Sequence, residues 1–203
     1  MNDNGIAVVN AKGGVGKTST AANVSGIAAV SGYRTLVIDL DPQGNLARDL
    51  GYRETEIDDR GFSMVQACQH GIKLNPQETG RENLDVVPGG EQLRFLADSA
   101  SAIEATRQDS NADYALLDAL TAVAEDYDLI VIDCPPGEGY LQRLALNAVR
   151  FVVVPSQADD ASLDGLDGVA DLFIRVRKTN PTLELLGVFL FEVQAGPAGE
   201  PTR

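Results

Sequence analysis

A glycine-rich segment near the N-terminus, placed between an apolar run and a helix-forming stretch, constrains the fold more than any other feature. The apolar run Ile6–Val9 predicts a buried strand, and residues 10–18 follow with the sequence NAKGGVGKT. Helical spacing of apolar residues then continues from about Thr18 to Val30. Strand, glycine-rich loop, Lys-Thr and helix, in this order, are typical of a loop that binds the phosphates of a nucleotide. The chain therefore begins with one strand–loop–helix unit of an α/β fold.

The chemistry of phosphate binding explains why these residue types occur together. Glycines let backbone N–H groups converge on phosphate oxygens, and the positive end of the following helix points at the same place. Lys17 places a cation on the outer phosphates, and the Thr18 hydroxyl is a ligand for Mg²⁺. We expect ATP and Mg²⁺ as cofactors, bound by Lys12, Gly13, Gly14, Val15, Gly16, Lys17, Thr18 and Ser19.

The position of Lys12 leaves two interpretations open. It precedes Lys17 by five residues, in a loop where Ala11 replaces the first glycine of the general motif. Lys17 already serves the bound phosphates, so Lys12 can point away from them. It then either reaches a nucleotide held by a second subunit, as an arginine finger does, or lies solvated on the surface.

Acidic residues follow two further apolar runs. Thr35–Asp39 predicts a strand whose end carries Asp39 and Asp41, and Leu129–Ile132 predicts one that ends in Asp133. In open parallel sheets, ligands bind beyond the carboxyl ends of the strands. Two aspartates after one strand suit Mg²⁺ and an attacking water, and an aspartate after the other suits Mg²⁺ held through water.

The remaining pattern alternates apolar runs with helical stretches, which predicts a doubly wound α/β fold with a mostly parallel sheet and helices on both faces. The other strands are expected at Leu84–Val87, Phe151–Val154 and Leu185–Phe191. The other helices are expected at Phe62–His70, Glu91–Leu96, Tyr114–Val123, Leu141–Val149 and Ser162–Lys178. Tyr52–Arg60 and Thr106–Ala112 read as polar loops, and residues 1–203 as one domain.

Composition narrows the possible partners and the compartment. The net charge of −14 argues against binding nucleic acid over the whole surface, although a local basic patch remains possible. Cys68 and Cys134 lie far apart without metal-ligand spacing, which favours reduced thiols in the cytoplasm. No apolar run reaches the length of a membrane span, and Gln194–Arg203 lacks the periodicity of a membrane-binding helix, so we expect no membrane partner.

Taken together, the motifs resemble the ParA family of partition ATPases. Lys12–Thr18 fits the family's deviant phosphate-binding loop, and Asp39–Asn45 matches its Asp-x-Asp-Pro-Gln-Gly-Asn element. Asp133–Pro136 matches its Asp-Cys-Pro-Pro element. Val154–Gln157 and Leu163–Leu166 are similar to two further segments of the family. The resemblance extends from about residue 6 to residue 190.

The resemblance implies an ATP-dependent homodimer that hydrolyses ATP slowly and moves plasmid, phage or chromosomal DNA apart. Lys12 would be the signature lysine that crosses to the partner's nucleotide, and Asp41 would orient the hydrolytic water near the metal. Lys17 would be the phosphate-binding lysine, and Thr18 and Asp133 would serve Mg²⁺. A ParB-type centromere-binding protein and non-specific DNA are the implied partners, with a nucleoid location if DNA is bound.

The sequence departs from the family pattern at several places, and the last of these concerns DNA binding. Ser19 stands where a second Thr is usual, the chain is a few residues longer after Pro136, and residues 191–194 differ from the family's segment. The sequence also stops well short of the usual family length, without the C-terminal segment that carries adenine contacts and much of the DNA surface. Within the chain, the densest basic cluster is Arg175, Arg177 and Lys178, which is equally typical of a helix C-terminus.

Two other functions compete with the partition ATPase. The acidic surface and the short C-terminal part favour a nucleotide-gated protein-binding switch that hydrolyses negligibly. A positioning ATPase similar to MinD would share the lysine-rich loop, but that relative lacks the Pro-Gln-Gly-Asn segment found at residues 42–45.

Overall fold

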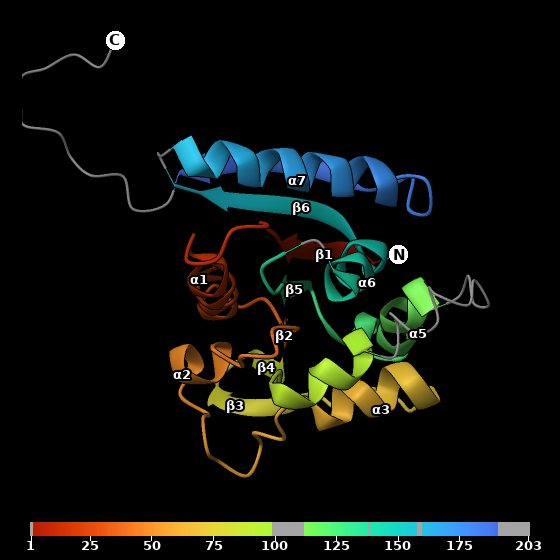
Figure 1. Cartoon of the computed structure of the whole chain (residues 1–203). Helices are drawn as coiled ribbons and strands as arrows, with labels where there is room; N and C mark the ends of the chain where they lie inside the picture. Colours follow the sequence, from red (N-terminus) through yellow and green to blue (C-terminus); the bar gives the residue numbers. More distant parts are fainter. Residues whose placement is uncertain (1, 99–111, 138, 158–159, 191–203) are drawn as a thin grey trace, which may run out of the picture.

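A computed structural model describes residues 2–98, 112–137, 139–157 and 160–190 of the chain. These residues form a seven-stranded sheet in the order β3-β4-β2-β5-β1-β6-β7 (Figure 1). The strands are β1 (Asn2–Val8), β2 (Thr35–Asp39), β3 (Gln77–Arg81), β4 (Leu84–Val87), β5 (Leu129–Asp133), β6 (Val149–Ser156) and β7 (Glu184–Leu190). All neighbours pair in parallel except β3 with β4. The expected doubly wound fold with a mostly parallel sheet is confirmed.

Helices connect the parallel strands. The α-helices are α1 (Lys17–Val30), α2 (Leu46–Leu50), α3 (Phe62–His70), α5 (Ala115–Thr121), α6 (Tyr140–Ala148) and α7 (Asp160–Val176). Short 3-10 turns are η1 (Glu91–Leu93), η2 (Ala112–Tyr114) and η3 (Ala124–Asp126), and residues 94–98 continue from η1 as an α-helix. Within the described part of the chain, every helix is too short or too polar to cross a bilayer.

The alternation of side chains in the central strands explains why helices cover both faces of the sheet. Leu36 and Ile38 point into one apolar core, whereas Val37 between them points into the other. The larger core receives side chains from α3, α5, α6 and α7, and the smaller core receives them from α1 and α2. Strands that are apolar at every position are therefore stable in the middle of this sheet, where helices cover both of its faces.

The register of the central strands sets the position of the candidate site. Asp39 at the end of β2 pairs with Asp133 at the end of β5, and Asp133 pairs with Val8 at the end of β1. Because all three strands run in parallel, their carboxyl ends meet at one edge of the sheet. The glycine-rich loop after β1 and the acidic residues after β2 and β5 are thus neighbours.

The sheet edges differ from the sequence prediction. β3, which was not predicted, is a polar antiparallel strand that pairs with β4 at one edge. β7 was expected to be covered on both faces, but this is wrong: its large apolar side chains are 38–56% exposed. Among the described residues, β7 is the last strand of the sheet and pairs with β6 alone.

Several element boundaries also shift. α2 follows the loop after β2 and was not predicted, and Val149, expected as the last residue of a helix, is the first residue of β6. Tyr52–Arg60 is free of regular structure, as expected. Residues 106–111, most of the second expected loop, lie outside the described residues, and so do residue 191 of the last expected strand and residues 194–203.

Candidate functional site

The glycine-rich loop connects the end of β1 at Val8 to the start of α1 at Lys17. Gly14 and Gly16 have φ angles of 76° and 84°, a left-handed conformation that disfavours side chains. A Cβ added to Gly13 or Gly14 would meet no atom within 4 Å, so the space above the loop is open. The curvature of the glycine-rich loop therefore leaves room for a ligand at the N-terminus of α1.

A cavity of about 470 Å³ lies over this loop. Six of the eight predicted loop residues line it: Gly13, Gly14, Gly16, Lys17, Thr18 and Ser19. Lys12 is not part of the lining, and Val15 is fully buried, so a contribution from Val15 is limited to its backbone. The opposite wall includes Asp41, Gln43 and Pro136, which come from the loops after β2 and β5. The three loops that the sequence singled out thus surround one cavity.

The side chain of Lys17 is held at the base of the loop. Its Nζ donates a hydrogen bond of 2.8 Å to the carbonyl of Lys12, and the residue is only 7% exposed. Burial lowers the pKa of the Lys17 ammonium, an effect opposed by the Asp133 carboxylate. The backbone N–H of Lys12 donates to Asn10 Oδ1 at 2.8 Å. This arrangement fixes Lys17 but leaves both interpretations of the Lys12 side chain open.

Asp133 is fully buried beside the loop. Among the described residues, neither of its oxygens has a hydrogen-bond partner of good geometry. Burial raises the pKa of Asp133 to about 7, and the nearby Thr18 hydroxyl and the Lys17 ammonium only partly oppose the rise. A buried carboxylate without a partner is costly, and a bound cation is one way in which proteins compensate it.

The donor set fits a magnesium ion that is shared with phosphates. Thr18 and Asp41 line the cavity, and the carboxylate of Asp41 is close enough to contribute to the raised pKa of Asp133. The described residues hold no cluster of three or more His, Cys, Asp or Glu side chains that could bind a metal alone. Mg²⁺ commonly takes one or two protein carboxylates and completes its shell with water and substrate phosphates.

Asp39 and Asp41 have different surroundings, although the sequence suggested that they act together. Asp39 is fully buried; its Oδ1 accepts the N–H of Asp41 at 2.8 Å, and its Oδ2 accepts the N–H of Leu46 at 3.3 Å. Burial, followed by the charge of Asp133, raises the pKa of Asp39 well above its usual range. Because both oxygens bind loop backbone, Asp39 shapes the loop, and of the two aspartates only Asp41 lines the cavity.

Gln142 on α6 is a site residue that sequence reasoning missed. It is 1% exposed, and its Nε2 donates to the carbonyl of Pro135 at 2.7 Å and, more weakly, to that of Asn10 at 3.4 Å. The side chain thus joins the loop after β5 to the start of the glycine-rich loop. No spacing signal distinguishes this glutamine from a surface position of an amphipathic helix, so only the tertiary structure identifies it.

The end of β6 and the residue that follows it also contact the glycine-rich loop. Asn10 Nδ2 donates to the carbonyl of Pro155 at 2.8 Å, and Gln157 Nε2 donates to the carbonyl of Gly14 at 3.3 Å. Cys134, by contrast, is buried with its pKa raised well above the usual range, which suits a packing role for its thiol.

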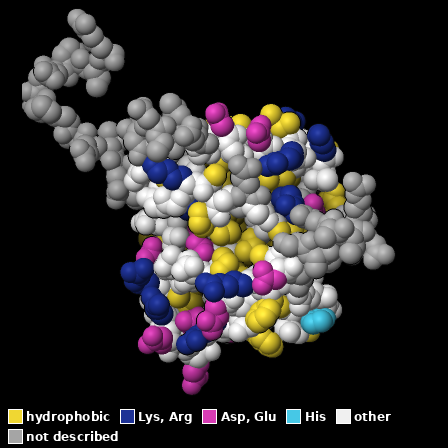
Figure 2. Space-filling model, viewed as in Figure 1, with side chains coloured by type: hydrophobic (Ala, Val, Ile, Leu, Met, Phe, Trp, Pro, Cys, Tyr) yellow, Lys and Arg dark blue, Asp and Glu magenta, His cyan; other side chains and the backbone are white. Residues whose placement is uncertain are grey.

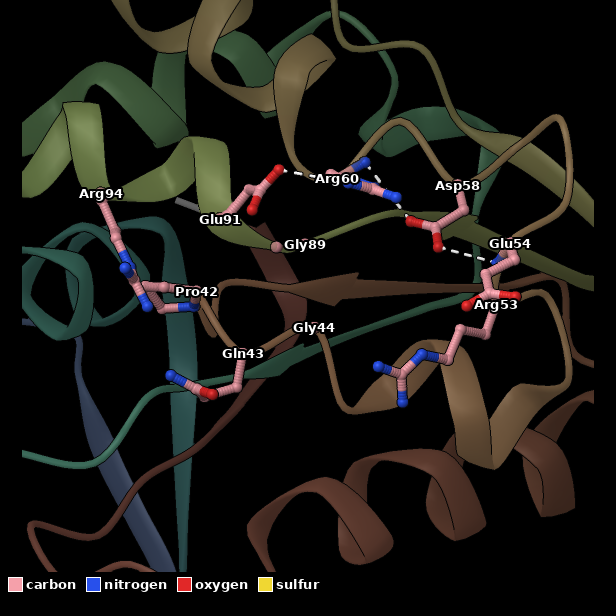
Figure 3. Close-up of a pocket in the computed structure, with 11 residues that line it drawn as sticks. Pro42, Gln43, Gly44, Arg53, Glu54, Asp58, Arg60, Gly89, Glu91 and Arg94 are labelled. Carbon is pink, nitrogen blue, oxygen red and sulfur yellow. Dashed lines mark hydrogen bonds and ion pairs between the residues drawn. The ribbon is translucent and has the colours of Figure 1, made fainter.

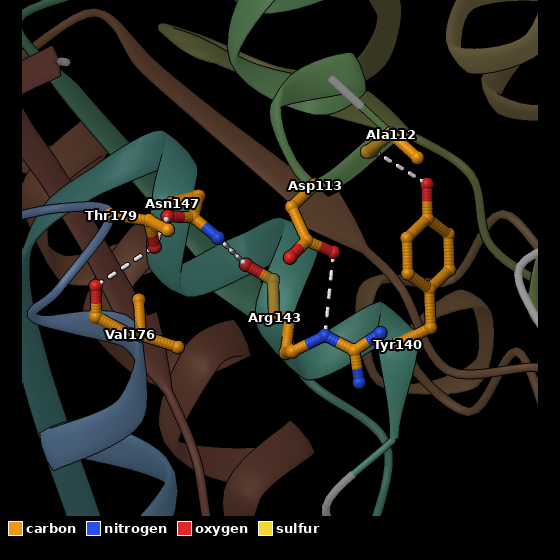
Figure 4. Close-up of polar contacts among 7 residues, drawn as sticks. All are labelled: Ala112, Asp113, Tyr140, Arg143, Asn147, Val176 and Thr179. Atoms are coloured by element: carbon orange, nitrogen blue, oxygen red, sulfur yellow. Dashed lines mark hydrogen bonds and ion pairs between the residues drawn. The ribbon is translucent and has the colours of Figure 1, made fainter. Parts of the chain in front are cut away.

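The predicted basic cluster lies away from the cavity. Arg175 is in the last turn of α7, and Arg177 and Lys178 follow it, all three exposed. Next to this end of α7, Thr179 Oγ1 donates to Asn147 Oδ1 at 2.7 Å, and Arg143 forms a 3.3 Å ion pair with Asp113 (Figure 4). The Thr179–Asn147 contact ties the end of α7 to α6, the Arg143–Asp113 pair ties α6 to η2, and the three cations face solvent.

Comparisons with known proteins agree with this geometry. A family model described as an AAA domain matches residues 4–185. The chain is 37% identical over 191 residues to the sporulation initiation inhibitor protein Soj of Bacillus subtilis, covering 94% of this chain and 73% of that protein. It is 35% identical over 192 residues to the chromosome partitioning protein ParA of Myxococcus xanthus, covering 91% of this chain and 63% of that protein.

A solved structure of similar fold is known with a nucleotide. Cobyrinic acid a,c-diamide synthase from Mycobacterium smegmatis, crystallised with ADP and magnesium, superposes with a TM-score of 0.81 at 30% identity. The match covers 93% of this chain and 74% of the synthase. The fold of the chain is therefore one on which an adenine nucleotide and magnesium have been observed together.

Proposed function

Because the chain belongs to the ParA family of P-loop partition ATPases, we propose that it binds ATP with Mg²⁺ in the cavity over the glycine-rich loop and hydrolyses the ATP slowly. The observation that carries this proposal is the buried carboxylate of Asp133 beside Lys17 and Thr18, which among the described residues has no hydrogen-bond partner of good geometry. A site with a lysine, a hydroxyl and two carboxylates around an open glycine loop suits a magnesium triphosphate.

Each residue has a role that follows from its place. Backbone N–H groups of Gly13–Ser19 and the Lys17 ammonium would bind the phosphates. Thr18 would ligate Mg²⁺ directly, and Asp133 would hold it through water. Asp41, on the opposite wall of the cavity, would orient the water that attacks the outer phosphate. Bound Mg²⁺ supplies charge neutralisation on the phosphate oxygens.

Three further parts of the proposal concern partners. Lys12 would reach the nucleotide of a second copy in an ATP-dependent homodimer, which agrees with its absence from the lining of its own cavity. A ParB-type centromere-binding protein would accelerate hydrolysis, and the cycle would move replicons apart in the cytoplasm. The relatives named for chromosome partitioning and sporulation initiation support this assignment.

Substitution of Asp41 by Ala tests the proposed chemistry. The Asp41→Ala variant should bind ATP with Mg²⁺ as the wild type does, release little or no phosphate in a single turnover, and accumulate as a dimer by light scattering. Asp118→Ala, which removes an exposed carboxylate on α5, is the matched control. Unchanged hydrolysis in Asp41→Ala would remove this role from Asp41.

The wild type itself separates this function from the alternative one. ATP binding without hydrolysis in the wild type, with DNA and a partner peptide present, would favour the nucleotide-gated switch instead.

We also propose that Arg175, Arg177 and Lys178 contribute to non-specific DNA binding. The exposure of all three at one end of α7 supports it. Charge reversal of Arg175 and Arg177 should weaken DNA binding and reduce its salt dependence, because fewer counterions are released. Identical affinity and salt slope would exclude these residues from a DNA-binding surface.

A further inference from the structure

A second cavity, of about 330 Å³, lies on the other side of the loop that carries Asp41. Three segments form its walls: the loop after β2 at residues 42–44, the irregular stretch at residues 53–60, and residues 89–94 after β4. Figure 3 shows these segments around the opening. Gln43 lines this cavity and also the one over the glycine-rich loop, so a single loop separates the two.

Three arginines from two of these segments face this cavity, in a chain with only 16 Lys and Arg against 30 Asp and Glu. Arg60 is paired with Glu91 at 3.3 Å. Arg53 and Arg94 are exposed, and their guanidinium groups make no hydrogen bond or ion pair with any described residue. In Figure 3 the side chains of Arg53 and Arg94 extend from opposite sides toward the loop at Pro42, Gln43 and Gly44. The cavity therefore has two cations available for a ligand.

Three acidic side chains, Glu54, Asp58 and Glu91, line the same cavity, and none of them forms an ion pair with Arg53 or Arg94. Asp58 accepts the N–H of Glu54 at 3.1 Å and of Arg60 at 3.4 Å, so its carboxylate stabilises the loop backbone. Glu54 and Arg60 have positive φ angles of 60° and 57°, which are uncommon for residues with side chains. Such backbone strain persists only where surrounding structure enforces it, and it is frequent at ligand sites. In Figure 2, acidic and basic side chains gather together in the region where Figure 1 places α2.

At the floor of the cavity, the backbones of its three segments pack directly against one another. A Cβ on Gly44 would lie 3.3 Å from the Cα of Gly90, and a Cβ on Gly90 would lie 2.8 Å from the Cα of Arg60. With no side chains between them, the loop after β2 cannot move toward residue 90 without displacing residue 90 and, through it, residue 60. A ligand that draws Arg53 and Arg94 together would therefore also restrain the loop that carries Asp41.

We propose that this second cavity binds a small phosphate monoester, with its phosphate on Arg53 and Arg94, and that its occupancy controls the position of the Asp41 loop. Guanidinium groups bind phosphate through paired charge-assisted hydrogen bonds. Glu54 lines the same cavity and offers acceptors for hydroxyl groups, which favours a phosphorylated sugar over bare phosphate. The volume suits a small ligand. The control of hydrolysis rests on the proposed ATPase function, whereas the binding does not.

The binding is tested with the glycine-rich loop blocked by saturating ADP and Mg²⁺. Ribose 5-phosphate, inorganic phosphate and ribose are titrated separately into the full chain and followed by amide NMR, with the signals of Gly89 and Gly90 as reporters. We expect saturable binding of ribose 5-phosphate, weaker binding of phosphate and none of ribose. The double variant Arg53→Gln/Arg94→Gln should bind at least about ten-fold more weakly, since two charge-assisted contacts are lost.

Arg34→Gln/Arg150→Gln is the control, because it removes the same charge from two arginines outside the cavity, of which Arg34 is exposed and Arg150 is partly buried. Its affinity for ribose 5-phosphate should equal that of the wild type, and thermal unfolding should confirm that all variants fold. No saturable binding to the wild type, or equal binding to both double variants, would overturn the site. Binding of an acidic hexapeptide that depends on Arg53 and Arg94, without binding of ribose 5-phosphate, would overturn the ligand class.

Control of the Asp41 loop is tested separately through ATP turnover. Saturating ribose 5-phosphate should change the turnover of the wild type about five-fold or more, in the range of typical coupling energies, and should leave that of Arg53→Gln/Arg94→Gln unchanged. An unchanged rate in the wild type despite binding would overturn the regulatory half alone. A chain that hydrolyses no ATP under any condition, yet binds ribose 5-phosphate through Arg53 and Arg94, would contradict the proposed function and not the site.

Discussion

At the scale of single residues, two buried carboxylates at adjacent strand ends dominate the electrostatics of the site. Asp39 satisfies its oxygens with loop N–H groups, whereas Asp133 has no such partner among the described residues. Burial raises the pKa of both. The difference in partners separates their roles: Asp39 holds a loop, and Asp133 has unused acceptor capacity beside the cavity.

The raised pKa of Asp133 predicts how stability depends on pH without nucleotide. The pKa is about 7 in the folded chain and roughly 4 when unfolded, so between these values the folded state binds more protons. Stability should therefore fall as pH rises from about 4 to about 7. In Asp133→Asn, the free energy of unfolding should fall less over this pH range, by on the order of a few kcal/mol. The variant should also have a higher thermal unfolding temperature than the wild type at pH 8. Part of the fall should remain, because the pKa of Asp39 is raised too.

Thermal unfolding of nucleotide-free protein across this pH range measures the effect. Asp118→Asn, which neutralises an exposed carboxylate on α5, is the control and should keep the wild-type slope. An Asp133→Asn variant with the same slope as the wild type would show that Asp133 is ionised in the folded chain.

Sequence alone anticipated the residues around the cavity better than it anticipated what they contact. The glycine loop, Asp41 and Asp133 follow apolar runs, and the carboxyl ends of parallel strands must meet. The separate surroundings of Asp39 and the bridging contacts of Gln142 depend on backbone groups brought in from distant segments. Local pattern carries no information about such contacts.

At the scale of elements, close backbone packing fixes the loop after β2. A Cβ on Gly89 would lie 2.6 Å from both the carboxyl carbon and the carbonyl oxygen of Asp39, and Gly44 packs on Gly90. Gly89→Ala should therefore destabilise the chain by about 1–3 kcal/mol, as overpacking does, and should weaken ATP hydrolysis more than ATP binding, because Asp41 lies two residues beyond Asp39. Denaturant unfolding and single-turnover phosphate release measure the two effects.

A glycine without close neighbours provides the control. Gly26 lies inside α1, and a Cβ there would meet nothing within 4 Å, so Gly26→Ala should stabilise the chain by roughly 0.5–1 kcal/mol through helix propensity. If Gly89→Ala is as stable and as active as the wild type, the loop moves more freely than its packing implies.

Elements with a strong apolar signal were predictable, and those without one were not. β2, β4 and α3 have the boundaries expected from their apolar residues. β3 is polar at most positions and forms because the neighbouring β4 offers an open edge. α2 has only five residues, too few for helical periodicity to show. Tertiary pairing and packing, rather than local propensity, determine both.

At the scale of the whole molecule, the two edges of the sheet have opposite character. β3 closes one edge with a polar antiparallel strand, whereas β7 leaves Leu186, Val188 and other apolar side chains about half exposed at the other. Exposed apolar edge strands favour pairing with another chain. We expect the isolated chain to associate reversibly as its concentration rises, with or without nucleotide. This distinguishes the process from the proposed ATP-dependent dimerisation.

Lysine substitutions on β7 test this expectation. Leu186→Lys/Val188→Lys should shift the chain toward the monomer in light-scattering measurements over a concentration series, because charged side chains block strand pairing. Ile27→Lys/Ile174→Lys adds the same charge at exposed apolar positions of α1 and α7 and should leave association unchanged. Equal association of both double variants would show that β7 does not mediate it.

The contrast between the two edges also limits how far such association can go. Two chains that join through their β7 edges would be related by a two-fold axis and form one continuous sheet, with a β3 edge at each outer end. Those outer edges are polar and antiparallel, and present no apolar strand to a third chain. Assembly would stop at two copies instead of growing into a filament.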